Sequence, residues 1–215
     1  MISVPVLNIE GKEVGKLDVD EALLGTQLRP ALLKQALVRY HANSRQGTVR
    51  TRSRAEIEGS TKKLYAQKGT GNARRGSIRT SVMKGGGNAF AKRPRDFSQD
   101  MPLKQRRLAR ANAILAKILS KDIKVLDGLT LPAQKTKEVA KVLKNIGVER
   151  SALIATEGLN QDFFRCARNI EKLAVKPAAD INAYDILTKR SLVMTKAALE
   201  GVLKTCTKSK VKQES

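Results

Sequence analysis

The chain has 215 residues, enough for one domain of ordinary size, and 41% of them are hydrophobic, so much of it must fold around a core. Its 42 lysines and arginines outnumber 20 aspartates and glutamates, and a net charge of +22 repels itself unless a polyanion neutralises it. These numbers favour nucleic acid as the partner, with an anionic membrane surface as the weaker alternative. A membrane span is not expected, because no stretch of the sequence approaches the roughly 20 apolar residues that a span needs.

The first 44 residues are predicted to contain two strands and a helix. Apolar residues on either side of Glu10-Gly11-Lys12 suggest two short strands: Val4 and Val6 before it, and Val14 with Leu17 after it. Pro30 is well placed as the first residue of a helix that reaches about Ser44. One face of this helix is apolar and consists of Leu33, Leu37 and Tyr40.

The next segment carries most of the positive charge. Residues 45–110 contain 18 basic and 4 acidic residues, whereas residues 1–44 contain 5 of each and residues 111–215 contain 19 and 11. Residues 45–99, called the arm below, hold 8 of the 15 glycines and show no helical or strand periodicity. So long an irregular insert is either a disordered linker or a segment ordered by what it binds.

The composition of the arm decides between these two. Arginine and lysine alternate with glycine and with three aromatic residues, Tyr65, Phe90 and Phe97. Glycine allows close approach of the backbone to a ligand, arginine matches the geometry of phosphate, and aromatic faces can stack on bases. The arm is therefore predicted to become ordered on RNA.

After the arm, helices and strands are predicted to alternate. Helices are expected over residues 103–120, 136–146 (ending before Gly147), from a cap at Asn160 through Ala167, and from a cap at Thr195 to about Lys204. Strands are expected over residues 123–126, 152–155, 173–175 and 192–194. This order predicts an α/β fold with a mostly parallel sheet and helices on both faces. Residues 1–44 and 100–207 would form one globular domain, and residues 208–215 a frayed basic tail.

The first helix after the arm carries four cations near its N-terminus: Lys104, Arg106, Arg107 and Arg110. Cations at this end oppose the helix dipole at a cost of about 0.3–1 kcal/mol each, and bound phosphates would remove that cost. The alternative is a merely solvated basic face.

No catalytic, cofactor or metal site is predicted. Gly69-Thr70-Gly71-Asn72-Ala73-Arg74 lacks the third glycine of a dinucleotide motif, and Ser77 stands where a phosphate-binding loop needs lysine. His41 has no partner placed by a motif, and Cys166 and Cys206 lack metal-ligand spacing. The first residues lack the pattern of an export signal, so a cytoplasmic protein is expected.

The arm also resembles a known family. Arg45-Gln46-Gly47-Thr48 resembles the R-Q-G-T of the bacterial form of the fourth protein of the large ribosomal subunit. Residues 62–74 resemble its K-K-P-W-R-Q-K-G-T-G-R-A-R, and residues 75–79 its next element. Gly85-Gly86-Gly87 with Phe90, and then Pro94-Arg95-Asp96, match its G-G-G-x-x-F and P-R-D. Residues 132–137 and 167–170 agree more loosely. The chain departs from the pattern at Leu64, Tyr65, Ala66 and Asn72, which removes two cations and a large ring.

The resemblance implies a structural protein whose arm threads through large-subunit rRNA and whose tip lines the polypeptide exit tunnel beside the protein twenty-two family. Its partners would be that rRNA, neighbouring large-subunit proteins and the nascent polypeptide, without a membrane. Some relatives also repress their own operon by binding its messenger RNA. The residues expected at the tip are Tyr65, Gln67, Lys68, Gly69, Thr70, Gly71 and Asn72. The residues expected to bind RNA are Arg45, Arg50, Arg52, Arg54, Lys62, Lys63, Lys68, Arg74, Arg75, Arg79, Lys84, Arg93, Arg95, Lys104, Arg106, Arg107 and Arg110.

Two rival functions stay open at this point. A free RNA or DNA regulator would suit a compact basic patch better than a long glycine-rich arm. A nucleotide-using enzyme would be stabilised against heat by its nucleotide.

Overall fold

The computed structural model describes residues 1–148 and 150–214, with side chains described through residue 206. The chain forms two compact units, one of Met1–Tyr40 with Asp100–Ser215 and the other of His41–Gln99. The first unit contains the sheet and its helices, and the arm lies wholly within the second unit.

The first unit begins with the predicted pair of strands. β1 (Ile2–Leu7) and β2 (Glu13–Val19) pair in antiparallel fashion. In the turn between them, the side-chain oxygen of Asn8 accepts hydrogen bonds of 3.0 Å from the backbone N–H groups of Glu10 and Lys12. Gly11 has φ +83°, and a Cβ there would lie 2.3 Å from the Asn145 carbonyl oxygen, so only glycine fits. The two predicted strands are confirmed, and the structure shows that they form a hairpin.

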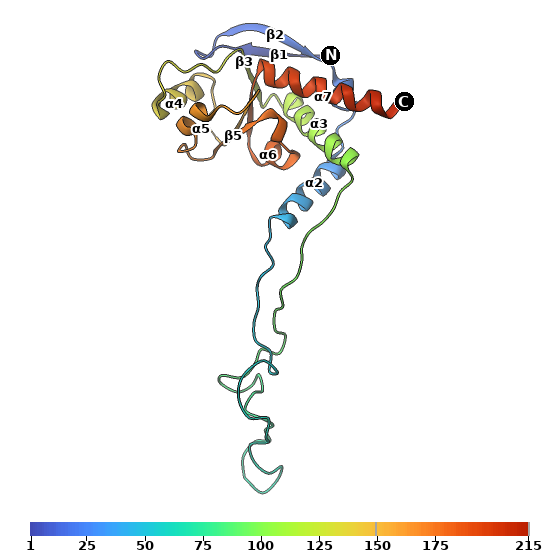
Figure 1. Ribbon diagram of the computed structural model, residues 1–215, viewed down its shortest axis with the longest axis vertical. Coiled ribbons are helices and arrows are strands. Elements are labelled where there is room, and N and C mark those ends of the chain that lie inside the picture. Colours follow the sequence, from blue (N-terminus) through green and yellow to red (C-terminus); the bar gives the residue numbers. More distant parts are fainter. Residues whose placement is uncertain (149, 215) are drawn as a thin grey trace. The chain divides into compact units, whose positions relative to one another are not determined.

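Four further strands complete a six-stranded sheet: β3 (Ile123–Leu126), β4 (Ala152–Thr156), β5 (Leu173–Pro177) and β6 (Ser191–Thr195). The order across the sheet is β2-β1-β3-β6-β4-β5, and every neighbouring pair except β1–β2 is parallel. The predicted mostly parallel sheet is therefore confirmed (Figure 1).

The helices are α1 (Glu21–Leu24), α2 (Pro30–Asn43), α3 (Leu103–Leu119), α4 (Thr136–Asn145), α5 (Gln161–Ala167), α6 (Ala183–Thr188) and α7 (Lys196–Glu214), with a 3₁₀ turn η1 (Ala178–Asp180). Both predicted caps are confirmed. The Asn160 side chain accepts from the Phe163 N–H at 3.0 Å, and the Thr195 hydroxyl accepts from the Ala198 N–H at 3.3 Å.

The predicted end of the last helix was wrong. α7 continues to Glu214 instead of stopping near Lys204, because neither glycine nor proline follows Lys204 to end it. The tail expected over residues 208–215 thus falls largely on helical backbone, while its side chains and residue 215 lie outside the described part of the chain.

Strand residues alternate between two apolar clusters, one on each face of the sheet. In β4, Leu153 and Ala155 face a cluster with α3, α6 and α7, whereas Ile154 faces α4 and α5. In β6, Val193 likewise faces the second cluster and its neighbours face the first. Helices therefore cover both faces, as the α/β prediction required (Figure 1).

Two polar side chains of α3 are buried in this core. Asn112 is 0% exposed; its oxygen accepts from the Arg29 N–H at 2.9 Å, and its amide donates to the Leu24 carbonyl at 3.1 Å. The ammonium of Lys117 donates to two consecutive carbonyls, those of Lys189 and Arg190, at 2.8 Å each. These contacts join α3 to the connection between α1 and α2 and to the turn before β6.

Candidate nucleic-acid interface

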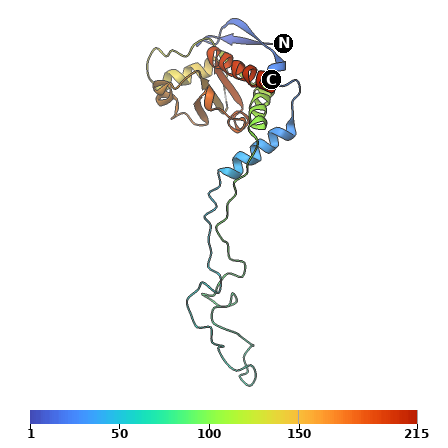
Figure 2. The same cartoon turned by 45° about the vertical axis from the view of Figure 1, so that its right-hand side comes forward.

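The arm contains no helix or strand between residues 44 and 102, all of which the structure describes. It is nevertheless organised, because two extended stretches, residues 43–54 and 87–99, run side by side (Figures 1 and 2). We call these two stretches the stem. Backbone hydrogen bonds join the pairs Gly47–Arg95, Thr51–Lys92 and Arg52–Asn88 at 2.9–3.1 Å. The Asn43 side chain also bonds both the N–H and the carbonyl of Gln99.

Two stem glycines are required by the close approach of these stretches. Gly47 has φ +70°, and a Cβ there would lie 2.1 Å from the Arg95 carbonyl oxygen. A Cβ on Gly87 would lie 2.2 Å from the Arg54 backbone nitrogen. The glycines therefore allow backbone-to-backbone packing, and the basic side chains project from a narrow ribbon.

Two predicted RNA-binding arginines share one aromatic ring at the start of the stem. The guanidinium carbons of Arg45 and Arg95 lie 3.7 and 4.2 Å from the centre of the Phe97 ring. Stacking uses the face of each guanidinium and leaves its in-plane N–H groups available to phosphate oxygens. Phe97 thus holds two like charges in a fixed position.

A third stem arginine is paired with a carboxylate. Arg50 donates to Glu56 at 3.1 Å, and the other Glu56 oxygen accepts from the Ser53 N–H at 3.1 Å. The Ser53 hydrogen bond, followed by the Arg50 hydrogen bond, holds the pKa of the Glu56 carboxyl below its ordinary value. By contrast, Arg52, Arg54, Lys92 and Arg93 are exposed on the same stem.

Residues 55–63 and 77–86, called the middle lobe, consist of successive turns. The carbonyls of Ser77, Thr80 and Met83 each accept from the N–H three residues later, at 3.4, 3.0 and 2.9 Å respectively. Arg75 donates to the Met83 sulfur at 3.2 Å, while Nε of Arg79 is buried without a partner among the described residues. Lys62, Lys63 and Lys84 are exposed in this lobe.

The far end of the arm is a loop closed at residues 64 and 76, called the tip loop. The Leu64 N–H donates to the Gly76 carbonyl at 3.1 Å, and the Tyr65 hydroxyl donates to the Ala73 carbonyl. Gly69 and Gly71 have φ of +85° and +69° with nothing near their Cβ positions. The tip residues Gln67, Lys68, Thr70 and Asn72, together with Arg74, are exposed. Tyr65 therefore braces the loop from inside.

The four cations of α3 lie in the first unit and differ in role. Lys104 and Arg107 are exposed, whereas Arg106 is half-buried with an unpartnered Nε among the described residues. Arg110 donates to the Ala178 and Ala179 carbonyls, and burial lowers its pKa. Arg110 thus supports the fold, and the phosphate-binding prediction rests mainly on the other three.

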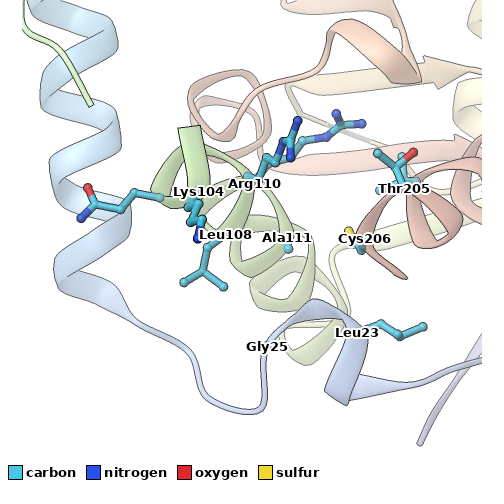
Figure 3. Close-up of a pocket in the computed structure, with 11 residues that line it drawn as sticks. Leu23, Gly25, Lys104, Leu108, Arg110, Ala111, Thr205 and Cys206 are labelled. Carbon is cyan, nitrogen blue, oxygen red and sulfur yellow. The ribbon is translucent and has the colours of Figure 1, made fainter. Parts of the chain in front are cut away.

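Lys104, Arg107 and Arg110 also border a cavity of about 260 Å³ between α1, α3 and α7 (Figure 3). Its other walls are largely apolar and include Leu23 of α1, Leu108 and Ala111 of α3, and Val202 and Cys206 of α7. Among the side chains that the structure describes, no carboxylate or histidine borders the cavity, and they therefore form no acid–base pair there.

The part of the chain that the structure describes contains neither a candidate metal site nor a candidate membrane-spanning helix. No three histidine, cysteine, aspartate or glutamate side chains are grouped closely enough there to hold a metal ion. None of the helices assigned there has the length and apolar character needed to cross a membrane. His41 is exposed at the end of α2, where its carbonyl accepts from the Ser44 hydroxyl at 2.7 Å.

Comparison with known proteins supports the family that the arm motifs resemble. The model of the ribosomal protein L4/L1 family matches residues 17–204. A large ribosomal subunit protein uL4 of Rhodopirellula baltica is 41% identical over 203 residues, covering 94% of this chain and 91% of the relative. Proteins with the same name from Lachnospira eligens and Symbiobacterium thermophilum are each 42% identical, over 93% and 94% of this chain and 97% and 98% of theirs. These matches confirm the resemblance carried by the arm motifs, and the chain belongs to the ribosomal protein L4/L1 family.

Proposed function

We propose that this chain is a structural constituent of the large ribosomal subunit that binds large-subunit rRNA through its arm and aids rRNA folding during assembly. The observation that carries the proposal is the stem. Its glycines bring two extended stretches of backbone together, and its exposed cations lie along both stretches. Relatives named as large-subunit proteins across nearly the whole chain support the same assignment. The chain would act in the cytoplasm, on the ribosome.

The distribution of contacts within the arm supports binding to phosphates. Residues 45–99 carry 14 basic and 3 acidic side chains. One of these acidic residues, Glu56, is already paired with Arg50, which leaves an uncompensated row of exposed cations along the stem. Phosphate contacts of this kind position a protein on RNA without reading its sequence. The stem would therefore supply affinity.

We also propose that the tip loop lines the polypeptide exit tunnel, beside a protein of the protein twenty-two family and within reach of the nascent polypeptide. Support comes from the motif resemblance and from the form of the loop, which is closed at Leu64 and Gly76 and exposes small or polar residues. Lys68 is the cation best placed on this loop to face a passing chain.

Sedimentation tests the main proposal. The endogenous protein should remain with large subunits after a high-salt wash that removes loosely bound factors. Recovery in the free fraction after the wash, with large subunits intact, would contradict it. A free regulator of RNA or DNA would give that second result.

A further inference from the structure

The three aromatic residues of the arm are used differently, and one of them has no protein surface to cover it. Phe97 carries the Arg45 and Arg95 guanidinium groups on its ring. The Tyr65 hydroxyl is bonded within the tip loop. Phe90 is 98% exposed. A fully exposed phenylalanine forgoes a favourable apolar burial, which a partner that covers its ring would supply.

The backbone around Phe90 forms an anchored bulge. The Asn88 N–H donates to the Arg52 carbonyl at 3.0 Å. Lys92 is held by Thr51 through two hydrogen bonds, from the Lys92 N–H to the Thr51 hydroxyl at 2.7 Å and from the Thr51 N–H to the Lys92 carbonyl at 2.9 Å. Thr51 and Arg52 are adjacent in one stretch, and they thus fix both ends of the segment 88–92 in the other stretch.

None of the backbone hydrogen bonds found among the described residues joins the three residues between these anchors to the facing stretch, and Phe90 in their middle is exposed. Immediately before the bulge, Gly87 is buried against the Arg54 backbone with no space for a Cβ. This packing fixes the start of the bulge from the other side. Phe90 is therefore presented on a short segment that is hydrogen-bonded at both ends to the facing stretch of the stem.

The charge around the bulge identifies the kind of partner. Arg52, Arg54, Lys92 and Arg93 are all exposed within a few residues of the bulge. A projecting aromatic ring surrounded by cations suits a base whose phosphates lie on either side, because the ring stacks on the base while the cations bind the backbone. An apolar pocket of a protein would not need these cations.

We propose that Phe90 stacks on an unpaired base of rRNA and fixes the register of the stem along its RNA site. The proposal rests on the proposed rRNA-binding function. It adds a contact that requires an unpaired, accessible base, whereas the stem cations bind phosphates. Its ligand is a single-stranded loop or bulge, because paired bases in a duplex already have both faces covered.

The first test is binding of the full-length protein to protein-free large-subunit rRNA at fixed salt. Phe90→Ala should weaken binding by about 5- to 150-fold, the range expected for loss of one stacked base, without changing the salt slope. Val82→Ala is the matched control, because Val82 is a 78% exposed apolar residue of the same arm, and it should bind like wild type. On a fully paired RNA duplex, Phe90→Ala and wild type should bind equally.

The second test uses the absence of tryptophan from the chain. Phe90→Trp keeps a stacking ring and should retain near wild-type affinity, and its emission should be quenched by rRNA more strongly than that of Val82→Trp. Because neither residue packs against the fold, these variants should fold normally.

Several outcomes would overturn the proposal. They are equal affinity of Phe90→Ala and wild type for rRNA, an equal loss on duplex RNA, or equal quenching of the two tryptophans. Unchanged rRNA binding with reduced incorporation into large subunits would show that Phe90 contacts a protein instead. If wild type itself fails to bind rRNA, the proposed function fails, and this result is separate from failure of the stacking proposal.

Discussion

Glu56 illustrates how single residues shape the basic stem. Its carboxylate holds the Ser53 N–H and the Arg50 guanidinium together, and both contacts lower its pKa. Because the folded pKa is depressed, the contribution of this carboxylate to the turn is complete above the ordinary glutamate pKa. It is lost as the pH falls through the lowered value.

We therefore expect the Ser53 amide resonance to titrate with a midpoint below the ordinary glutamate pKa. Glu56→Gln should abolish this titration, and Arg50→Gln should move the midpoint upward by removing one of the two stabilising contacts. Nuclear magnetic resonance of the full-length protein across acidic pH measures both effects. A midpoint at or above the ordinary value would show that the carboxylate is not held as described.

In the core of the first unit, Asn112 also joins two backbone groups through its side chain. Asn112→Ala would leave the buried Leu24 carbonyl and the part-buried Arg29 N–H without their side-chain partner. We expect the free energy of unfolding to fall by about 2–4 kcal/mol. Urea denaturation measures this value, with exposed Lys144→Ala as the control, expected within about 0.5 kcal/mol of wild type. Equal stability of both variants would contradict a structural role for Asn112.

At the scale of elements, we predict that the arm is mobile in the free protein although the first unit is ordered. The arm has few buried apolar residues to offset an ordering cost on the order of 1–2 kcal/mol per residue. Limited trypsin digestion should cut first between Arg50 and Arg95, and rRNA should protect these sites. Early cleavage between residues 123 and 203 would contradict this division.

We also predict that the stem and the tip loop have separable roles. Deleting Tyr65–Arg74 joins Leu64 to the neighbour of its hydrogen-bond partner Gly76, so the remaining arm should keep its form. This variant should enter large subunits nearly as well as wild type but alter macrolide sensitivity or nascent-chain stalling.

Changing Arg52, Arg54, Lys92 and Arg93 to glutamine should instead impair incorporation. These four are preferred over Arg45 and Arg95, whose removal would also disturb Phe97. The measurement is the fraction of large subunits that contain each variant, with macrolide sensitivity scored in the same strains. Loss of incorporation on tip deletion but not on stem substitution would reverse the assignment.

The strands and the longer helices were predictable from sequence, and three short helical segments were not. The hairpin, the parallel strands, α3 and the caps at Asn160 and Thr195 follow from periodicity and capping chemistry, which are local signals. α1, η1 and α6 are too short to show a helical period. The bulge at Phe90 depends on hydrogen bonds to Thr51 and Arg52, about forty residues away, which no local pattern reveals.

At the scale of the whole molecule, the α/β class with helices on both faces is confirmed, and family membership confirms the prediction that the chain is not an enzyme. The division into domain, arm and tail stays a prediction, as do the individual RNA-binding residues. The excess charge is concentrated in residues 45–110, and we propose that it binds rRNA mainly through the arm.

The salt dependence of rRNA binding tests this central claim most directly. About ten phosphate contacts would give a slope of log affinity against log salt of roughly −7 to −9. The four-residue stem variant should reduce the slope by about 3 units, because four contacts are removed. A control with Lys135, Lys137, Lys144 and Arg168 of the first unit changed to glutamine removes the same charge and should stay within about 1 unit of wild type. A nearly flat salt dependence of the wild type, or an equal change in the two variants, would contradict the account.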